Sequence, residues 1–353
     1  MKPTFWRGKR VFVTGHTGFK GGWLSLWLQQ AGALVHGFST LPPTEPNLFT
    51  VARLARGLAG HTLGDVRDAA ALKQALVAAQ PEVVFHLAAQ PLVRHSYKEP
   101  TETYAVNVLG TVHLLEAVRA ARSVRAVVNV TTDKCYENRE WHWGYRESEP
   151  MGGHDPYSSS KACAELVTAA YRSSFFAGAD IGIASARAGN VIGGGDWAPD
   201  RLLPDFFRAT DAHQAMSVRY PDATRPWQHV LEPLGGYLML AEALFNDPVR
   251  RAGAWNFGPT DDDARSVRRV LDHLTACLPG ARWEAVGGEH LREAGYLKLD
   301  SSKARNELGW RPAWNLEQAL SMTAAWHEAW RGGRDMAQVC VEQIEAYQAR
   351  AAI

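Results

Sequence analysis

Short apolar runs alternate with longer amphipathic stretches over the first half of the chain. The runs are nearly all apolar and rich in β-branched residues, which is typical of parallel strands covered on both faces. They span residues 10–14, 34–38, 83–87, 126–131 and 181–185. The stretches between them have helical periodicity and span about residues 20–31, 69–79, 101–121 and 156–176. This alternation predicts an α/β fold with a Rossmann-like, doubly wound parallel sheet.

The pattern changes after Arg187. A glycine-rich segment, 189–195, is followed by scattered proline and tryptophan, which indicates irregular loops with short helices. A helix over about 232–246 and a strand over 255–258 then predict a return to the sheet. The chain therefore divides into a sheet domain and a smaller, mixed C-terminal lobe. We expect the sheet domain to comprise residues 1–188 plus 229–258, and the lobe residues 189–228 plus 259–353.

The composition excludes several classes of protein. The 353 residues include 38 basic and 37 acidic side chains, and this balance gives no charge surplus for a nucleic-acid partner. The four cysteines lack C-x-x-C spacing and the 13 histidines form no ligand pattern, so we expect reduced thiols and no metal site. The sequence begins without a secretory signal, and the apolar stretch 21–33 is too short to cross a bilayer. We expect a cytoplasmic protein with no membrane partner.

A glycine-rich loop follows the first predicted strand and opens the first long helix. Its glycines, Gly15, Gly18 and Gly21, are spaced three residues apart. Glycine permits positive φ in the turn, and the missing side chains let backbone N–H groups approach a pyrophosphate at the positive end of the helix. A glycine triplet alone is weak evidence for a cofactor site. Here a strand precedes it and a helix follows it, which is the context of a dinucleotide-binding site. The loop therefore predicts a dinucleotide cofactor.

The end of the second predicted strand does not identify that cofactor. Sites for NAD usually have an acidic residue there, which binds the adenosine ribose. This strand ends Ser39-Thr40-Leu41, with neither a carboxylate nor the basic residue that a 2′-phosphate would need. On the residues alone, NAD and NADP both stay open. Asp65, followed by Val66, has two interpretations: a partner for the adenine amino group, or the N-cap of the next helix.

Two groups of polar residues indicate catalysis. Tyr157 and Lys161 lie four residues apart on one face of a predicted helix, where the ammonium is expected to lower the pKa of the phenol. Thr132 and Asp133 follow the fourth predicted strand. Ligands bind at the carboxyl ends of strands in open α/β sheets. We therefore expect these four side chains to converge in one crevice and to carry out acid–base chemistry.

These motifs resemble those of the extended short-chain dehydrogenases/reductases that modify nucleotide sugars. Longer runs resemble the CDP-glucose 4,6-dehydratase group of that family, over essentially the whole chain. The runs are 14–21, 86–94, 132–136, 187–197, 225–230 and 308–312. The resemblance implies a hydro-lyase that converts CDP-glucose to CDP-4-keto-6-deoxy-glucose and water. Hydride would move from C4 to C6 through a tightly held NAD that is regenerated in each cycle.

The resemblance also implies catalytic roles. Tyr157, helped by Lys161 and Thr132, would accept the proton of the 4-hydroxyl group, and Asp133 would protonate the departing C6 oxygen. Related dTDP-glucose dehydratases have a glutamate as the C5 base, at the place where this chain has Lys134. Our hypothesis is that Lys134 takes part in the elimination, either as a neutral base or by stabilising the enolate.

The resemblance further assigns binding residues. The cofactor would contact the glycine loop, two later strand ends and the catalytic pair. These residues are Gly15, Thr17, Gly18, Phe19, Lys20, Gly21, Asp65, Val66, Leu87, Ala88, Ala89, Asn107, Tyr157 and Lys161. The nucleotide sugar would contact Gln90, Asn190, Arg201, Leu202, Arg225 and Tyr296. The sheet domain would thus bind NAD and the C-terminal lobe the nucleotide sugar.

The same relationship implies a homodimer through the helices near 101–121 and 156–176, and a place in deoxysugar synthesis for O-antigen lipopolysaccharide. Other functions stay open: a nucleotide-sugar 4-epimerase, a dehydratase of another nucleotide hexose, or a non-catalytic NAD(P)-sensing regulator. Epimerases commonly lack the pair formed by Asp133 and Lys134, and regulators often lose the tyrosine or the lysine. The intact set therefore favours a dehydratase.

Overall fold

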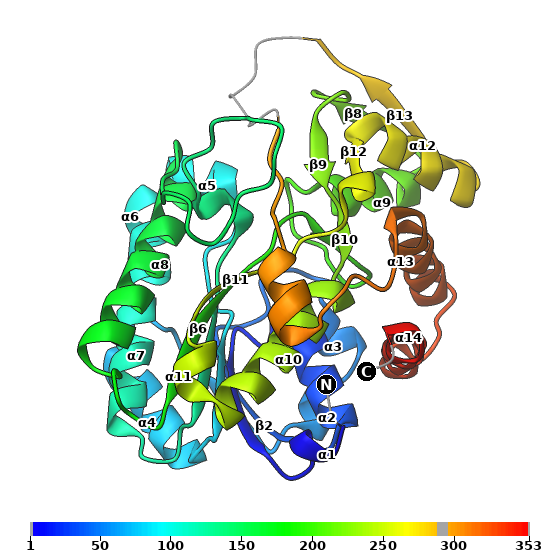
Figure 1. The fold of residues 1–353 in the computed structure, drawn as a ribbon. Coiled ribbons are helices and arrows are strands. Elements are labelled where there is room, and N and C mark those ends of the chain that lie inside the picture. Colours follow the sequence, from blue (N-terminus) through cyan, green and yellow to red (C-terminus); the bar gives the residue numbers. More distant parts are fainter. Residues whose placement is uncertain (1–2, 288–295, 352–353) are drawn as a thin grey trace.

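A computed structural model describes residues 3–287 and 296–351. Its centre is a sheet flanked by helices (Figure 1). The strand order is β3-β2-β1-β4-β5-β6-β11, and every neighbouring pair is parallel. The strands are β1 (Arg10–Thr14), β2 (Leu34–Ser39), β3 (Gly60–Leu63), β4 (Val83–His86), β5 (Ala126–Val130), β6 (Gly182–Arg187) and β11 (Gly253–Asn256). The order reverses between β1 and β4, which places a crevice at that point. The predicted Rossmann-like, doubly wound sheet is confirmed.

Helices cover both faces of the sheet because successive strand residues point to opposite sides. Val11 and Val13 pack with α2 and α10, whereas Phe12, between them, packs with α4 and α7. The longer helices are α2 (Phe19–Gln30), α4 (Ala69–Ala79), α7 (Gly110–Ala120), α8 (Pro156–Ser174) and α10 (Leu231–Asn246). Short helices complete this part: α1 (Pro3–Trp6), α3 (Leu48–Val51), α5 (Val93–Lys98), α6 (Pro100–Tyr104) and α11 (Pro248–Arg251).

Two elements differ from the sequence-based prediction. The strand β3 was not expected, since its residues are mostly exposed and form no apolar run. The helix expected over 101–121 is instead α6, a π-helical turn over Ala105–Leu109 and then α7. Such turns are frequent at functional sites. Here the turn carries Asn107, whose buried amide faces the crevice backbone described below.

The C-terminal lobe is mixed, as predicted, and has its own apolar core. Its strands pair in twos: β7 (Val191–Ile192) with β10 (Gln228–His229), β9 (Thr224–Pro226) with β12 (Ala264–Ser266), and β8 (Ala215–Val218) with β13 (Arg282–Ala285). Its helices are α9 (Leu202–Asp211), α12 (Val267–Cys277) and α13 (Leu316–Arg331). The last helix, α14 (Met336–Ala351), returns to pack on α2, where the Tyr347 and Trp27 ring centroids are 5.5 Å apart.

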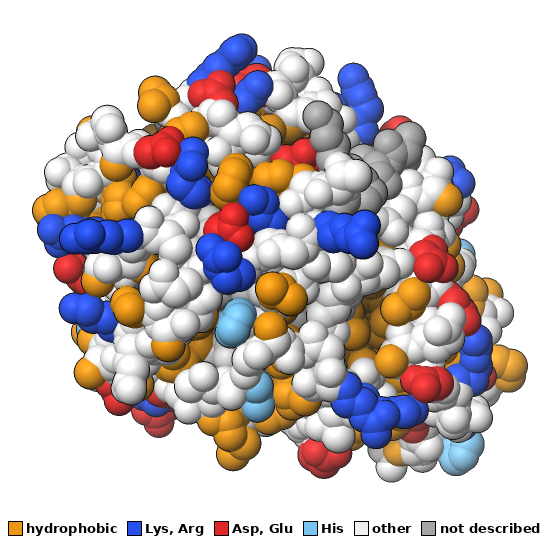
Figure 2. Space-filling model, turned by 90° about the horizontal axis from the view of Figure 1, so that it is seen from below, with side chains coloured by type: hydrophobic (Ala, Val, Ile, Leu, Met, Phe, Trp, Pro, Cys, Tyr) orange, Lys and Arg blue, Asp and Glu red, His pale blue; other side chains and the backbone are white. Residues whose placement is uncertain are grey.

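The surface matches the balanced composition. On the face seen in Figure 2, basic and acidic side chains are interspersed and are not gathered by sign. All four cysteines are free thiols. Within residues 3–287 and 296–351, none of the helices combines the length and the apolar character needed to cross a bilayer.

Candidate active site

The crevice between sheet and lobe has a volume of about 1530 Å³. Sites for one small ligand usually measure about 300–1,000 Å³, so this crevice has room for a dinucleotide together with a second ligand. It runs along the carboxyl ends of the central strands, and residues of the lobe line its other side. All residues that the sequence predicted for the site line it, except Asn107 and Tyr296.

The glycine loop joins β1 to α2 and forms one wall of the crevice. Gly15 has a φ of 77°, and a Cβ atom there would lie 2.7 Å from the backbone nitrogen of Ala88. A Cβ atom on Gly21 would lie 2.1 Å from the Gly15 carbonyl oxygen. Both positions therefore require glycine, which lets α2 start directly against the loop. The resulting cradle of backbone groups at a helix N-terminus fits the pyrophosphate of a dinucleotide.

Hydroxyl groups line the crevice where the second strand ends. The side-chain oxygens of Thr17 and Ser39 are 2.8 Å apart, and the Thr17 hydroxyl also donates to the Thr40 carbonyl at 3.1 Å. The crevice-lining residues between 39 and 48 are all uncharged. An adenosine ribose would therefore meet hydroxyl groups here, and a 2′-phosphate would meet no cation from the lining residues between 39 and 48.

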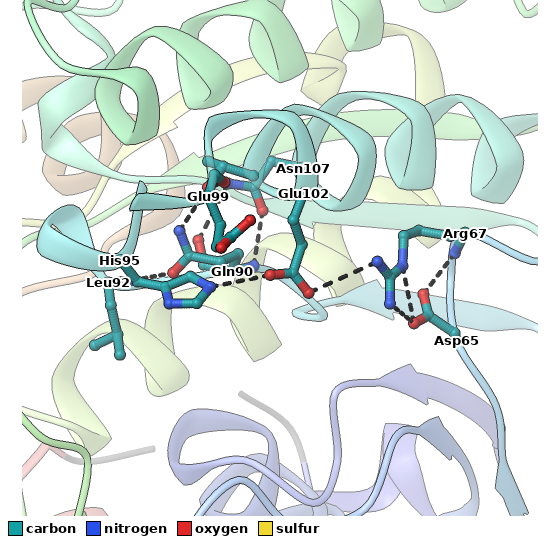
Figure 3. Close-up of polar contacts among 9 residues, drawn as sticks. Asp65, Arg67, Gln90, Leu92, His95, Glu99, Glu102 and Asn107 are labelled. Carbon is teal, nitrogen blue, oxygen red and sulfur yellow. Dashed lines mark hydrogen bonds and ion pairs between the residues drawn. The ribbon is translucent and has the colours of Figure 1, made fainter. Parts of the chain in front are cut away.

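Asp65 is held in place by Arg67 (Figure 3). The backbone N–H of Arg67 donates to Asp65 Oδ1 at 2.8 Å, and its guanidinium lies 2.6 Å from Oδ2. These hydrogen bonds lower the pKa of the Asp65 carboxyl group. Asp68 caps α4, so the N-cap interpretation of Asp65 is wrong. Asp65 is thus a fixed, charged acceptor at the crevice edge. Arg67 also forms an ion pair with Glu102 at 3.6 Å, and Glu102 in turn contacts His95.

Asn107 acts behind the crevice wall (Figure 3). Its Oδ1 accepts from the Gln90 backbone N–H at 2.9 Å, and its Nδ2 donates to the Gln90 carbonyl at 3.1 Å and to Ser160 Oγ at 2.8 Å. Gln90 in turn accepts the Leu92 N–H on its side-chain oxygen at 2.6 Å. The residues after β4 are therefore fastened to α8. Asn107 does not line the crevice but fixes the segment that does.

Thr132, Asp133 and Lys134 form a tight turn immediately after β5. A 3₁₀ helix over Asp133–Cys135 begins here, capped by Thr132, whose hydroxyl accepts the Lys134 N–H at 3.3 Å. The same hydroxyl donates to Asp133 Oδ1 at 3.0 Å. Asp133 is only 1% exposed, whereas Lys134 is half-buried. A carboxyl group shielded from water therefore lies beside an ammonium that is open to the crevice.

Tyr157 and Lys161 face this turn from α8. Burial raises the pKa of Tyr157 to about 12, although the Thr132 hydroxyl, hydrogen-bonded to the phenol, acts in the opposite direction. The expected lowering of the Tyr157 pKa is therefore wrong, because burial outweighs the neighbouring charges. Burial also lowers the pKa of Lys161 to about 8, and its Nζ donates to the Val130 carbonyl at 3.4 Å.

A buried ion pair that the sequence did not reveal supports the catalytic helix. Glu165, one turn after Lys161, lies 2.8 Å from the Arg187 guanidinium, and both side chains are 4% exposed. The Glu165 carboxylate also accepts hydrogen bonds from Ser185 and Thr131. Against the effect of burial, Arg187 lowers the pKa of Glu165 and keeps it ionised. The pair joins α8 to β6, and the spacing of Glu165 on the face of Lys161 is the one sequence signal for it.

The lobe contributes cations to the same crevice. Arg201 directly precedes Leu202, the first residue of α9. The Arg201 guanidinium lies 2.7 Å from the Asp196 carboxylate. Lys20, from the glycine loop, is close enough to Arg201 for charge repulsion to add to burial in lowering the pKa of Lys20 to about 8. Arg201 also acts on Tyr157. These cations surround a space suited to phosphate groups.

The other lobe residues predicted for binding lie at varied positions. Arg225, on β9, and Asn190, with a φ of 44°, line the crevice. Tyr296 lies beside it, where its carbonyl accepts from Asn138 Nδ2 at 3.1 Å. An ion pair that no sequence pattern indicated, Arg94 with Asp200 at 2.9 Å, joins the sheet side of the crevice to the lobe.

Comparisons with known proteins agree with this geometry. A family model described as GDP-mannose 4,6 dehydratase matches residues 12–253. A relative from Salmonella typhimurium, CDP-glucose 4,6-dehydratase, is 53% identical over 98% of each chain. A structure of dTDP-glucose 4,6-dehydratase from Bacillus anthracis in complex with NAD has a TM-score of 0.77 at 22% identity, covering 94% of this chain and 100% of that one. A UDP-glucose-4-epimerase from Stenotrophomonas maltophila, with bound NAD, also has a TM-score of 0.77, at 24% identity, covering 92% and 99%. The two solved structures establish the fold alone. The family model and the Salmonella typhimurium relative confirm the predicted relationship.

Proposed function

The chain belongs to the GDP-mannose 4,6 dehydratase family, and from this we propose that it is a CDP-glucose 4,6-dehydratase, an NAD-dependent hydro-lyase. The observation that carries the proposal is the meeting of Thr132, Asp133 and Lys134 with Tyr157 and Lys161 in one crevice. An epimerase needs only to remove and return hydrogen at C4. A dehydratase also needs an acid for the C6 oxygen, and Asp133 supplies one. The 53% identical CDP-glucose 4,6-dehydratase supports the choice of CDP-glucose as substrate.

The cofactor that fits the cradle is NAD. Backbone groups of the glycine loop would hold its pyrophosphate, Asp65 would accept from the adenine amino group, and Ser39 and Thr40 would face the ribose. The uncharged surroundings of Ser39 offer nothing to a 2′-phosphate, which favours NAD over NADP. When bound, NAD supplies transient oxidation at C4 and the later reduction at C6.

The residues of the chain move the protons. Tyr157 is hydrogen-bonded to Thr132 and lies one turn from Lys161, and burial favours its neutral phenol. The positive charges of Lys161 and of a bound NAD would favour the tyrosinate, which would accept the proton of the 4-hydroxyl group as C4 becomes a ketone. The ketone acidifies the C5 proton, and Lys134, open to the crevice, removes it or stabilises the enolate. Asp133 gives a proton to the C6 oxygen, the C6–O bond breaks with its electron pair, and water leaves. Loss of water leaves a double bond between C5 and C6. Addition of hydride at C6, which the cofactor would supply, and of a proton at C5 gives the 4-keto-6-deoxy sugar, still linked to the nucleotide.

The charges of the crevice are matched to the substrate. Arg201 and Arg225 would bind the nucleotide diphosphate, and Gln90, Asn190 and Leu202 would line its sugar. Tyr296, whose carbonyl accepts from Asn138, would lie beside the nucleotide sugar. One guanidinium group can donate two parallel hydrogen bonds to two phosphate oxygens. This geometry would orient the substrate as well as hold it. In this arrangement residues 1–188 and 229–258 bind the cofactor, and residues 189–228 and 259–353 bind the nucleotide sugar, with α14 bracing the cofactor side through α2.

A product assay tests the proposed function. Purified protein is incubated separately with CDP-, dTDP-, UDP- and GDP-linked hexoses without added reductant, and products are measured by mass. Loss of one water from CDP-glucose alone is the expected result. An isomer of unchanged mass would indicate an epimerase, water loss from a different nucleotide sugar would correct the base, and no conversion by protein with bound NAD would favour a regulator.

We also propose a homodimer formed through α7, α8 and the turn before α7. Leu109 and Leu166, on these neighbouring elements, are 52% and 59% exposed, and a partner chain seated here would cover both side chains. Light scattering should give twice the mass of one chain, and Leu166→Glu should shift it to a monomer. A wild-type monomer would overturn the proposal.

The cellular setting that we propose is the cytoplasm, in the synthesis of a deoxysugar for O-antigen lipopolysaccharide. Free thiols at all four cysteines fit a reducing compartment. An activated 4-keto-6-deoxy sugar is an intermediate suited to deoxysugar synthesis. Deletion of the gene should remove a deoxyhexose from the lipopolysaccharide, and an unchanged sugar composition would contradict this setting.

A further inference from the structure

Asp133 and two residues linked to it through shared neighbours each have a buried polar atom without a hydrogen-bond partner among the described residues. These atoms are Asp133 Oδ2, the Tyr237 hydroxyl and Gln228 Oε1. The other oxygen of Asp133 is already used, because it accepts from the Thr132 hydroxyl. Buried polar groups are nearly always hydrogen-bonded, directly or through ordered water. Three unpartnered atoms in one region therefore require an explanation.

Contacts connect the three residues behind the crevice. Asp133 Oδ2 rests against Gly189, where a Cβ atom would lie 1.8 Å from it. Gln228 Nε2 donates to the Gly189 carbonyl at 3.3 Å and to the Phe257 carbonyl at 2.9 Å. The Phe257 ring meets the Tyr237 ring with centroids 5.6 Å apart. A continuous layer of contacts thus runs from the catalytic carboxyl group to the Tyr237 side chain.

Tyr237 lies on α10, the helix that packs under β5, and is fully buried. Burial raises the pKa of its phenol, and the charges of Asp133 and Tyr157 raise it further. The hydroxyl therefore stays protonated and can act only as a donor toward an anion. Among the unpartnered atoms, Asp133 Oδ2 is the carboxylate oxygen that could accept a hydrogen bond from this donor.

Resting on the proposed function, we propose that Tyr237 is a positioning residue that supplies a hydrogen-bond donor to the buried side of Asp133 through one water. A single water accounts for all three atoms: it accepts from the Tyr237 hydroxyl and donates to Asp133 Oδ2 and Gln228 Oε1. Tyr237 does not touch the substrate.

The chemical consequence falls on the elimination step. When Asp133 gives its proton to the C6 oxygen, the C6–O bond breaks, water departs and Asp133 becomes a carboxylate. A donor on its inner oxygen stabilises that carboxylate and makes Asp133 a better acid. Oxidation at C4 does not involve this proton, so Tyr237 should affect water loss and leave C4 oxidation unchanged.

The test is the variant Tyr237→Phe, which removes only the hydroxyl group. In single-turnover experiments with CDP-glucose, water loss should slow about tenfold. The 4-keto-hexose intermediate should then accumulate while its rate of formation stays unchanged. With CDP-6-deoxy-6-fluoroglucose, fluoride departs with less need of an acid, so the variant should react at nearly the wild-type rate.

Tyr347→Phe is the matched control, since it removes a buried tyrosine hydroxyl that donates to Glu232, away from the crevice. It should lower the melting temperature without changing the partition between C4 oxidation and water loss. Wild-type protein that converts CDP-glucose, beside a Tyr237→Phe variant with unchanged water loss, would overturn this inference alone. Slow loss of both water and fluoride would also overturn it, because that pattern means a general structural defect. Wild-type protein that releases no water from CDP-glucose would overturn the proposed function itself.

Discussion

A Cβ atom on Gly189 would lie 1.8 Å from Asp133 Oδ2. The buried carboxyl group therefore packs directly against the backbone of this glycine. The backbone of Gly189 is not in the left-handed region, and its need for glycine is spatial. The residue comes from the end of β6, whereas Asp133 follows β5. The position of the proposed acid is therefore set by a neighbouring strand as well as by its own turn.

Gly189→Ala should displace Asp133 and slow the reaction. Since the new methyl group cannot share space with the carboxylate, we expect kcat to fall by about 10² or more, the contribution of a well-placed general acid. NAD should bind with unchanged affinity, because the glycine loop is untouched. Steady-state kinetics and a cofactor titration check both results. Gly287→Ala, where a Cβ atom meets no atom of residues 3–285 or 296–351 within 4 Å, is the control. Wild-type activity in Gly189→Ala would contradict the assignment of Asp133.

Lys161→Met should stabilise the cofactor-free protein while it abolishes activity. Burial lowers the pKa of Lys161 from 10.5 to about 8, so below pH 8 the fold holds a buried cation. Between pH 8 and 10.5 the unfolded state binds more protons, and wild-type stability rises with pH across this window. At pH 7 the variant should gain roughly 2 kcal/mol, which is about 3 from the removed charge less about 1 for the lost hydrogen bond to Val130.

Urea unfolding at several pH values measures this effect. The advantage of Lys161→Met should shrink as the pH rises and should be gone above pH 10.5. Lys98→Met, at an exposed lysine, should show no such trend. A variant that is less stable than wild type at every pH would show that the Lys161 ammonium is stabilising in the fold.

Lys134→Met tests whether this residue takes part in the elimination. If Lys134 removes the C5 proton or stabilises the enolate, turnover should fall by about 10². Incorporation of solvent deuterium at C5, measured by mass in heavy water, should fall with it. Lys134→Arg separates the two roles, because arginine keeps the charge but cannot act as a base at neutral pH. Unchanged turnover and unchanged exchange in Lys134→Met would remove this residue from the mechanism.

Local signals explain why most of the site could be predicted. Thr132 and Asp133 follow an apolar strand, and Tyr157 and Lys161 share one helical face, so each position can be read from a few neighbouring residues. The bond from Glu165 to Arg187 spans 22 residues and joins two elements. The spacing of Glu165 from Lys161 places it on the catalytic face of the helix, but nothing near Glu165 indicates that Arg187 is its partner. Tyr237 looks like a core residue in the sequence, because the role proposed for its hydroxyl depends on residues of other elements that only the fold brings to it.

Burial was the main quantity that the sequence could not supply. The spacing of Tyr157 and Lys161 led to the expectation of a lowered phenol pKa, yet the structure raises it to about 12. Spacing shows which charges are neighbours, whereas desolvation depends on everything that covers them. The π-helical turn around Asn107 was missed for a similar reason, since its amide bonds to the distant Gln90 backbone.

Glu232→Gln should change stability in a pH-dependent way. Glu232 is fully buried on α10 and accepts from the backbone N–H groups of Ala313 and Trp314 and from the Tyr347 hydroxyl. Burial raises the pKa of its carboxyl group from 4.5 to about 7. The stability that it contributes is therefore complete below pH 4.5 and is lost as the pH rises through about 7.

Glutamine keeps an acceptor oxygen but cannot ionise. The variant should match the wild type near pH 4.5 and exceed it by roughly 3 kcal/mol in free energy of unfolding well above pH 7. Urea unfolding at both pH values measures the difference. Glu317→Gln, at a glutamate whose side chain is 68% exposed, should show little change at either pH. An equal loss of stability at both pH values would instead mean that Glu232 holds the C-terminal helix as a carboxylate, because only the charged form binds these three donors more strongly than an amide oxygen does.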